Sequence, residues 1–293
     1  MATTLERPLR IGTRGSPLAL AQARLVADAL KAAHGWGADA IEIVAITTTG
    51  DMIQDRPLAD LGGKALWTKE LDSALFERRT DISVHSMKDV ETIRHDALAI
   101  GAMLERADAR DRLVGADSIA ALAQGARIGT SSPRRSAQLL HRRPDLEMVP
   151  IRGNVATRLA RVESGEYHAT LLAAAGLDRL GIRAGVPLDL LPAPAQGAIG
   201  AEILAERGDL GALLDAINHR PTHQAVSAER AFLAALGGDC RSAVAALAGG
   251  ATVRAEILSA DGSEVQAGEG APEELAHRLL AEASPALRAT FGR

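Results

Sequence analysis

Arginine side chains are concentrated in one stretch of the chain. Residues 127–161 contain eight arginines and two acidic residues, a local net charge of +6 in a chain of net charge −4. Arg134 and Arg135 follow Ser132-Pro133, and therefore fall in the first turn of a predicted helix. Positive charge at that position opposes the helix dipole unless an anion is shared. The stretch therefore indicates a localised anionic ligand, and the planar guanidinium group is suited to carboxylates.

We expect different positions for two further pairs of arginines in this stretch. Arg152 and Arg158 flank Gly153 at a second junction of a strand with a helix, so they are also candidates for contact with the anion. Arg142 and Arg143 stand at the end of a predicted helix, and we expect them on the solvated surface.

Cys240 is the only cysteine of the chain, which excludes an internal disulfide. It lies between Asp239 and Arg241 in a loop that contains glycine. The adjacent arginine favours the thiolate, whereas the aspartate opposes it. Because a lone cysteine is usually a small buried apolar residue, a structural and a functional thiol are both compatible with these neighbours.

Two other patterns are set aside. His219 and His223 have the spacing of metal ligands, but no glutamate follows His219, and Pro221 is expected to break the helix between them. Gly62-Gly63-Lys64 lacks the upstream glycine and the following serine or threonine of a phosphate-binding loop. We therefore expect no metal site and no P-loop.

Over the first 200 residues, short apolar runs alternate with helical patterns, which is typical of an α/β fold. An apolar period of 3.6 residues predicts a helix over 17–33, with Gly35 just beyond its end. The predicted strands are 9–13, 41–47, 81–84, 97–103, 127–129, 148–151 and 169–174.

One motif occurs twice. Residues 10–17 and 127–133 each contain a strand, a Gly-Thr turn, a serine at the helix cap and a proline as the first helical residue. Each copy predicts a helix N-terminus at the end of a strand, where an anion is favourable. Two copies predict two similar α/β domains that face each other across a cleft.

Near residue 195 the pattern changes, after a segment rich in proline at 192–197. Helices are predicted over 210–218, 225–236 and 273–287, with a strand at 244–247 and a hairpin through Asp261-Gly262. This predicts a small third domain of the α+β class. The expected domains are 1–104 with 193–218, then 105–192, then 219–293.

The composition argues against two classes of protein. The chain has 293 residues, 47% of them apolar, yet only six aromatic residues, too few for the base stacking of single-strand nucleic-acid binders. It has no apolar run of about 18 residues, the length that a membrane span requires. The first residues lack the apolar segment of a secretory signal, so we expect a cytoplasmic protein.

Nine segments together resemble one family, the hydroxymethylbilane synthases, also called porphobilinogen deaminases. They cover most of the first 240 residues in the family's order, and their combination is specific. The segments are RIGTRGSPLALAQA (10–23), TTTGD (47–51), GGKALWTKELD (62–72), DISVHSMKDV (81–90), GTSSPRRSAQL (129–139), IRGNVATRL (151–159), AAAGLDRLG (173–181), PAPAQGAIGAE (192–202) and AERAFLAALGGDC (228–240).

The resemblance implies two related α/β domains similar to those of periplasmic binding proteins, and a smaller α+β domain that carries a cysteine loop. It implies a transferase that condenses four porphobilinogen molecules head to tail into hydroxymethylbilane, with release of ammonia, in tetrapyrrole (heme) biosynthesis. It also implies a dipyrromethane cofactor, joined by a thioether to the loop cysteine, here Cys240. The family resemblance further suggests a monomer.

The resemblance also implies roles for residues. Asp89, with Lys88 beside it, is implied as catalytic: a carboxylate at the pyrrole nitrogens stabilises the cationic azafulvene left when porphobilinogen loses ammonia. Ser86 and Lys88 are implied to hold carboxylates next to it. Further cofactor contacts are implied for Thr130, Ser132, Arg134, Arg135 and Gly153, and substrate contacts for Arg14, Ser16, Arg152, Arg158, Arg179 and Gln196.

The sequence departs from the family pattern in two places. Asp239 stands where many relatives have glycine, and 241–243 replace a polar-Val-Pro run. Glu91-Thr92 replaces a continuation that contains proline, so the edge of the first domain is expected to differ locally. Residues 52–64, with Gly62-Gly63 as hinge, are implied as a mobile loop over the cleft.

Two other functions are compatible with parts of the sequence. A non-catalytic receptor for an anionic solute would also have two α/β domains with arginine near helix N-termini, but the third domain and Cys240 have no role in it. A nucleic-acid binder would use the arginine-rich stretch, but the few aromatic residues and the negative net charge disfavour it.

Overall fold

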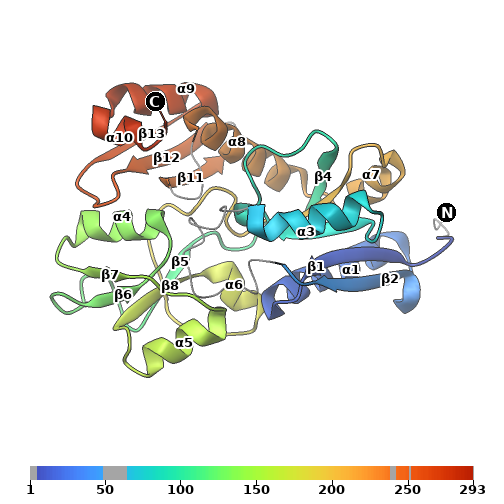
Figure 1. Cartoon of the computed structure of the whole chain (residues 1–293), viewed down its shortest axis with the longest axis horizontal. Coiled ribbons are helices and arrows are strands. Elements are labelled where there is room, and N and C mark those ends of the chain that lie inside the picture. Colours follow the sequence, from blue (N-terminus) through green and yellow to red (C-terminus); the bar gives the residue numbers. More distant parts are fainter. Residues whose placement is uncertain (1–4, 49–64, 238–241, 251, 293) are drawn as a thin grey trace. The chain divides into compact units, whose positions relative to one another are not determined.

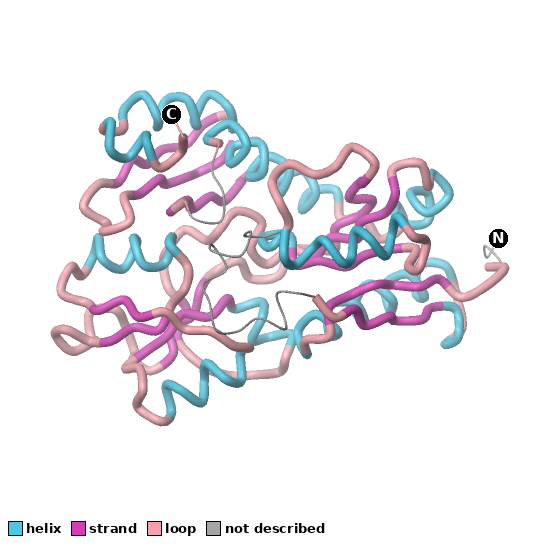
Figure 2. The backbone as a smooth tube through the Cα atoms, in the orientation of Figure 1, coloured by secondary structure: helices cyan, strands magenta, loops and turns pink. Residues whose placement is uncertain are grey.

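The chain folds into two compact units, and the computed structural model describes residues 5–48, 65–237, 242–250 and 252–292. Unit 1 consists of Met1–Ala107 and Ala198–His223, and unit 2 of Asp108–Gly197 and Gln224–Arg293. The described residues form three separate sheets, one in unit 1 and two in unit 2 (Figure 1, Figure 2).

The sheet of unit 1 has five strands in the order β2-β1-β3-β10-β4. β1 pairs in parallel with β2 and β3, whereas β10 pairs antiparallel with β3 and β4. The strands are β1 (Leu9–Arg14), β2 (Ile41–Ile46), β3 (Ile82–Ser86), β4 (Leu98–Met103) and β10 (Ile199–Leu204).

Helices pack on both faces of this sheet, against apolar side chains that alternate along its strands. In β2, Ile41 and Ile43 face the apolar layer that includes helix α1 (Pro17–His34) and helix α7 (Gly208–Asp215). Val44 and Ile46, of the opposite parity, pack with Leu71 of helix α3 (Ala65–Phe76). The described part of unit 1 also contains two short 3₁₀ helices, η1 (Ala38–Ala40) and η3 (Met87–Asp89).

The first sheet of unit 2 repeats the architecture of unit 1. Its order is β7-β6-β8-β5-β9; β6 pairs in parallel with β7 and β8, and β5 pairs antiparallel with β8 and β9. The strands are β5 (Asp111–Val114), β6 (Arg127–Gly129), β7 (Glu147–Val149), β8 (Ala169–Ala173) and β9 (Val186–Pro187), and the helices are α4 (Pro133–Arg142), α5 (Val155–Glu163) and α6 (Ala174–Arg179).

The duplicated motif lies at equivalent places in the two sheets. Ser16 after β1 caps α1 by accepting a hydrogen bond from the Ala19 amide at 3.3 Å, and Ser132 after β6 caps α4 through the Arg135 amide at 3.4 Å. The prediction of two related α/β folds is therefore confirmed. Strands β5, β9 and β10 are absent from the predicted set.

The second sheet of unit 2 is antiparallel, in the order β11-β12-β13, and it packs against helices from the C-terminal part of the chain. Phe232 of helix α8 and Leu279 of helix α9 are both fully buried in this core. The elements are α8 (Arg220–Leu236), β11 (Ala243–Gly249), β12 (Thr252–Leu258), β13 (Val265–Gly270), α9 (Pro272–Glu282) and α10 (Pro285–Ala289).

Two predictions about helices in this part were wrong. The single helix expected over 273–287 is divided, because Pro285 begins α10 and Ser284 caps it through the Leu287 amide at 3.1 Å. Pro221 does not break α8, because it lies in the first turn, where proline is tolerated. The boundaries of three domains stay a prediction, since the third sheet shares a compact unit with the second α/β sheet.

The core of the third sheet should be sensitive to loss of volume. We expect Phe232→Ala to lower the free energy of unfolding by about 3–5 kcal/mol, because a fully buried phenylalanine leaves a cavity. Phe76→Ala is the matched control, since Phe76 is 46% exposed. Urea denaturation measures both variants; equal losses from the two would contradict this packing.

Candidate active site

A pocket opens in unit 1 where β1 and β3 end. It has about 450 Å³ of empty space, part of it open to solvent. Because the two strands are parallel neighbours, with Ile11 paired to Ile82, their carboxyl ends meet at one edge of the sheet. The residues that line it are Arg14, Ser16, Leu18, Ala19, Gln22, Thr68, Val84, His85, Ser86, Asp89 and Val90.

The pocket brings together four of the five predicted site residues of unit 1. Arg14 ends β1, Ser16 caps α1, Ser86 ends β3 and Asp89 lies in η3, and all four are half-buried. Lys88, the fifth, is the neighbour of Asp89 in η3 but is not a lining residue.

Asp89 has an unusual environment for a carboxylate. Within the described part of the chain, its side chain makes no hydrogen bond or ion pair. By contrast, the buried acids among the described residues of unit 1, Asp81 and Glu202, are both paired with arginine. A partly desolvated carboxylate with no partner is suited to accept hydrogen bonds from a ligand or to stabilise positive charge on it.

Three lining residues with side-chain polar contacts were not predicted, namely Gln22, Thr68 and His85. Gln22 donates a hydrogen bond from Nε2 to the Ser86 hydroxyl at 2.7 Å, which joins α1 to the end of β3. His85 precedes Ser86 and contacts Glu202. The duplicated motif contains a signal for Gln22: it lies six residues after Ser16, as Gln138 lies six after Ser132, and both glutamines are 3% exposed.

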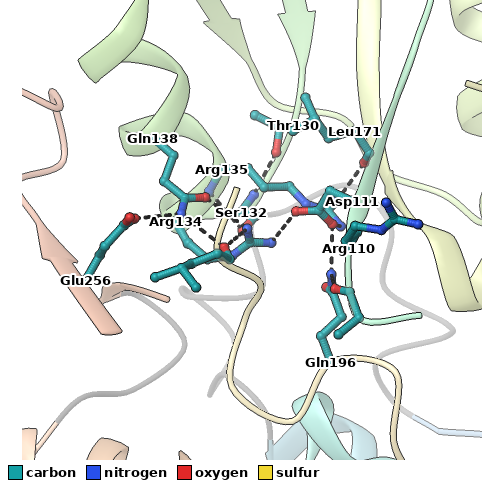
Figure 3. A network of polar contacts seen from close by, with 12 residues as sticks. Arg110, Asp111, Thr130, Ser132, Arg134, Arg135, Gln138, Leu171, Gln196 and Glu256 are labelled. Atoms are coloured by element: carbon teal, nitrogen blue, oxygen red, sulfur yellow. Dashed lines mark hydrogen bonds and ion pairs between the residues drawn. The ribbon is translucent and has the colours of Figure 1, made fainter. Parts of the chain in front are cut away.

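Unit 2 holds a buried ionic network at the equivalent helix N-terminus (Figure 3). Arg134 and Arg135 contact opposite oxygens of Asp111, at 2.8 Å to Oδ2 and 2.6 Å to Oδ1. Gln196 donates a hydrogen bond to Oδ1 of the same carboxylate at 2.9 Å. The anion expected beside these arginines is thus supplied within the fold by Asp111, a residue that no sequence pattern had indicated.

Burial and charge act in opposite directions on this group. Burial raises the pKa of Asp111, but Arg134 and Arg135 lower it by more, so it lies well below the ordinary aspartate value. Burial lowers the pKa of Arg134, and the Asp111 charge only partly offsets that effect. Gln138 connects the network to the third sheet by donating to Glu256 Oε2 at 2.9 Å (Figure 3).

The remaining predicted residues of unit 2 lie at strand and helix ends of its first sheet. Gly153 has a φ of +101°, and a Cβ there would lie 2.7 Å from the Thr157 side chain, so the position requires glycine. Arg158 donates to the Gly153 carbonyl at 3.0 Å. Arg179 donates to the Gly197 carbonyl at 2.6 Å, and burial lowers its pKa to about 10. Thr130 is buried, whereas Ser132 and Arg152 are half-buried.

Several predictions fall on residues outside the described ranges. Cys240, its neighbours Asp239 and Arg241, and residues 52–64 are among them. Within the described ranges, no group of three acidic, histidine or cysteine side chains could hold a metal ion. No helix in these ranges is long and apolar enough to cross a membrane.

Comparison with known proteins decides the family. Residues 9–211 match the family model described as porphobilinogen deaminase, dipyromethane cofactor binding domain. The chain belongs to the porphobilinogen deaminase family. A porphobilinogen deaminase from Sphingopyxis alaskensis is 57% identical over 98% of both chains. The chloroplastic porphobilinogen deaminase of Oryza sativa subsp. japonica is 48% identical over 88% of this chain and 76% of that protein.

Solved structures with a similar fold are more distant. A periplasmic substrate-binding protein of an ABC transporter from Coxiella burnetii is 15% identical, with a TM-score of 0.45, over 73% of this chain and 93% of that chain.

Membership of the porphobilinogen deaminase family establishes the activity. The chain is a transferase with hydroxymethylbilane synthase activity, which joins four porphobilinogen molecules head to tail with release of ammonia. It therefore acts in tetrapyrrole biosynthesis and uses a dipyrromethane cofactor. The family attaches this cofactor through a cysteine, and Cys240 is the only cysteine in the chain.

Asp111 should be essential for stability. We expect Asp111→Asn to lower the free energy of unfolding by about 3–5 kcal/mol, because two buried guanidinium groups lose their shared anion. Chemical denaturation at pH 7 measures the loss, and Asp145→Asn, which removes the partner of Arg143 on the surface, is the control and should change little.

The same variant should change the pH dependence of stability. Because the pKa of folded Asp111 lies below its unfolded value, its contribution is present above about pH 4 and is lost as the pH falls toward the folded value. The stability of Asp111→Asn should therefore fall less steeply on acidification. Parallel acid profiles for the variant and the natural chain would contradict the ion pairing.

Proposed function

We propose that the unit 1 pocket is the reacting centre of the enzyme and that Asp89 is its catalytic carboxylate. The observation that carries the proposal is the environment of Asp89: half-buried, in a pocket with Arg14 and Ser86, and without a partner in the described part of the chain. Every pyrrole of the substrate has an N–H group, and a free carboxylate is the side chain that accepts it most strongly.

The charge on Asp89 also suits the transition state. When the aminomethyl carbon of porphobilinogen loses ammonia, positive charge develops on the pyrrole ring. Two opposite unit charges about 4 Å apart attract by about 4 kcal/mol near a protein surface. That energy corresponds to roughly a thousandfold in rate if it is realised only in the transition state. Asp89 would thus favour departure of ammonia and hold the pyrrole N–H during attack.

The other side of the pocket is suited to carboxylates. Each pyrrole has an acetate and a propionate side chain. Arg14, Ser16 and the first amides of α1 lie on the pocket wall, and a helix N-terminus with a guanidinium group favours anions. We propose that they bind a substrate carboxylate while Asp89 binds the ring nitrogen, with Ser86 and Lys88 as further carboxylate contacts.

We propose further carboxylate contacts in unit 2. Two guanidinium groups against one carboxylate leave the group of Arg134, Arg135 and Asp111 with one positive charge, which favours a further anion. Gly153 precedes the N-terminus of α5, and a helix N-terminus favours anions. The proposed cofactor contacts are Thr130, Ser132, Arg134, Arg135 and Gly153, and the proposed substrate contacts are Arg152, Arg158, Arg179 and Gln196.

The chemistry of these side chains fits the dipyrromethane. Its pyrrole N–H groups and carboxylates need an acceptor and several cations, and the pocket residues Asp89 and Arg14 are of those two kinds. When bound, the cofactor supplies the terminal pyrrole to which the first substrate is joined. Cys240 is the proposed point of attachment, through a thioether.

We also propose that the enzyme acts in the cytoplasm as a monomer on small-molecule substrates, without nucleic acid or membrane. The support is the family resemblance for the monomer, and the net charge of −4 with only six aromatic residues against nucleic acid.

Asp89→Asn tests the catalytic assignment. The amide keeps the size of the side chain but has no charge, so we expect the turnover rate to fall at least about 100-fold with an unchanged circular dichroism spectrum. Asp96→Asn is the control, because Asp96 is exposed and lies outside the pocket. Near-normal turnover of Asp89→Asn would refute the assignment.

Cys240→Ser tests the attachment. Intact mass spectrometry of the natural chain should show a covalent adduct of dipyrromethane size, and the serine variant should show none, because a hydroxyl cannot replace the thiol as the thioether sulfur. Asp239→Gly, which restores the residue common among relatives, should retain the adduct. An active chain of unmodified mass would overturn the proposal.

A further inference from the structure

A buried ion network lies directly behind the pocket wall. Glu202 of β10 is fully buried, and its Oε2 is 3.1 Å from Nε2 of His85. Arg94 contacts both carboxylate oxygens of Glu202, from Nε and Nη2, at 2.8 Å each. His85 is 6% exposed and lines the pocket that contains Asp89. The network thus ends at the proposed reacting centre.

Arg94 extends the network to two more elements of unit 1. Its Nη2 contacts Asp72 of α3 at 2.6 Å, and its Nη1 contacts Glu91 at 2.8 Å. Glu91 also accepts a hydrogen bond from Thr68, a lining residue of the pocket, at 3.3 Å. Glu91 belongs to the segment that departs from the family pattern. This departure therefore provides one of the carboxylates that bind Arg94.

The network determines which nitrogen of His85 carries a hydrogen. Burial raises the pKa of Glu202, but His85 and Arg94 lower it by more, to about 2. The carboxylate is therefore ionised and can only accept, so Nε2 of His85 donates to it. Within the described residues, Nδ1 has no hydrogen-bond partner. In the neutral ring, this nitrogen is a base.

We propose that His85 is a second proton-carrying group of the pocket, and that Glu202 and Arg94 are positioning residues that hold it. The proposal rests on the assignment of the reacting centre to Asp89. In each condensation, the carbon–nitrogen bond of the aminomethyl group breaks with its electrons on nitrogen, a carbon–carbon bond forms, and the attacked pyrrole carbon loses a proton. The aminomethyl group reacts in its ammonium form and therefore leaves as neutral ammonia. His85 then accepts the proton of the attacked carbon at Nδ1 and passes it to the released ammonia, so the ring ends unchanged.

The division of roles follows from the charges. Asp89 keeps a negative charge opposite the developing cation, and a carboxylate that must stay ionised is poorly suited to hold the released proton as well. The titratable or charged groups that face His85 are Glu202 from β10, Arg94 and Glu91 from the segment after η3, Asp72 from α3, and Arg14 and Asp89 across the pocket.

His85→Gln tests the proposal in the full-length enzyme. The glutamine amide can still donate to Glu202 but cannot exchange a proton, so kcat should fall about 100-fold. KM for porphobilinogen should stay within about threefold, because carboxylate binding is left intact. Rates are expressed per chain that carries the mass adduct. His34→Gln is the matched control: His34 lies in the same unit with its ring nitrogen bonded to the Leu213 carbonyl at 3.0 Å, outside the pocket, and its kcat should be unchanged.

The pH profile separates proton transfer from a structural role. Protonation of Nδ1 removes the base, so the natural enzyme should lose kcat on the acid side through His85, and His85→Gln should lose that limb. A lower kcat with the same profile shape would show a structural role and overturn the proposal. A normal kcat of His85→Gln would also overturn the proposal about His85. If Asp89→Asn is inactive in the same assay, the assignment of the reacting centre still stands. If Asp89→Asn is active, that assignment is wrong as well.

A measurement without turnover completes the test. In ¹⁵N-histidine NMR of the adduct-free Cys240→Ser chain, the resonance absent from a His85→Gln derivative identifies His85. It should show a hydrogen on Nε2 and an Nδ1 that binds a proton on acidification. Glu202→Gln should alter that tautomer balance. A hydrogen on Nδ1 in the neutral ring, or an unchanged tautomer in Glu202→Gln, would overturn the proposal even if a variant fails to load the cofactor.

Discussion

The parallel pairing of β1 with β3 is the constraint on which the pocket of unit 1 depends. Parallel neighbours end at the same edge of a sheet. Arg14 and Ser16, at the end of β1 and just after it, therefore meet Ser86 and Asp89, at the end of β3 and just after it. The two segments are about 70 residues apart in the chain. The hydrogen bonds between β1 and β3, rather than any local preference, bring the two segments together. Apolar side chains of α1 and α3 pack on the two faces of the sheet and hold these strands in place.

The same pairing in unit 2 gives a different electrostatic result. Both units place a serine-capped helix after the second strand of the sheet order, β1 or β6. Both also have a fully buried acid on the strand that pairs antiparallel with its neighbours, Glu202 on β10 and Asp111 on β5. In unit 2 that acid is held by the arginines of the capped helix itself. In unit 1 it is held by Arg94 from a loop, and the capped helix has no arginine in its first turn. The pocket carboxylate Asp89 is thereby left available for a ligand.

Much of this arrangement could be predicted from sequence, because it is encoded locally. The Ser-Pro helix starts, the β-branched strands and the glycine at 153 each depend on neighbours within a few residues, and the structure has them. Asp111, Arg94 and Glu202 could not be found in this way. Each is an ordinary charged residue in its own segment, and only the fold brings their partners from β3, α3, β10 and α4 to within 3.1 Å. Strands β5, β9 and β10 were missed as well.

The pairing of charges explains how one fold tolerates so many buried ionic groups near a site for carboxylates. A buried ion pair stabilises little by itself, because desolvation of both charges offsets most of their attraction. Removing one member of such a pair, however, costs folding free energy, because the other charge stays buried without its partner. Arg94 is therefore held in place beside Glu202, which is fully buried in the sheet. Because these ion pairs fix the position of the pocket wall, the Asp89 carboxylate can stay without a partner among the described residues. The proposed reacting centre therefore rests on a separation between paired acids that hold the wall and Asp89, which has no partner among the described residues.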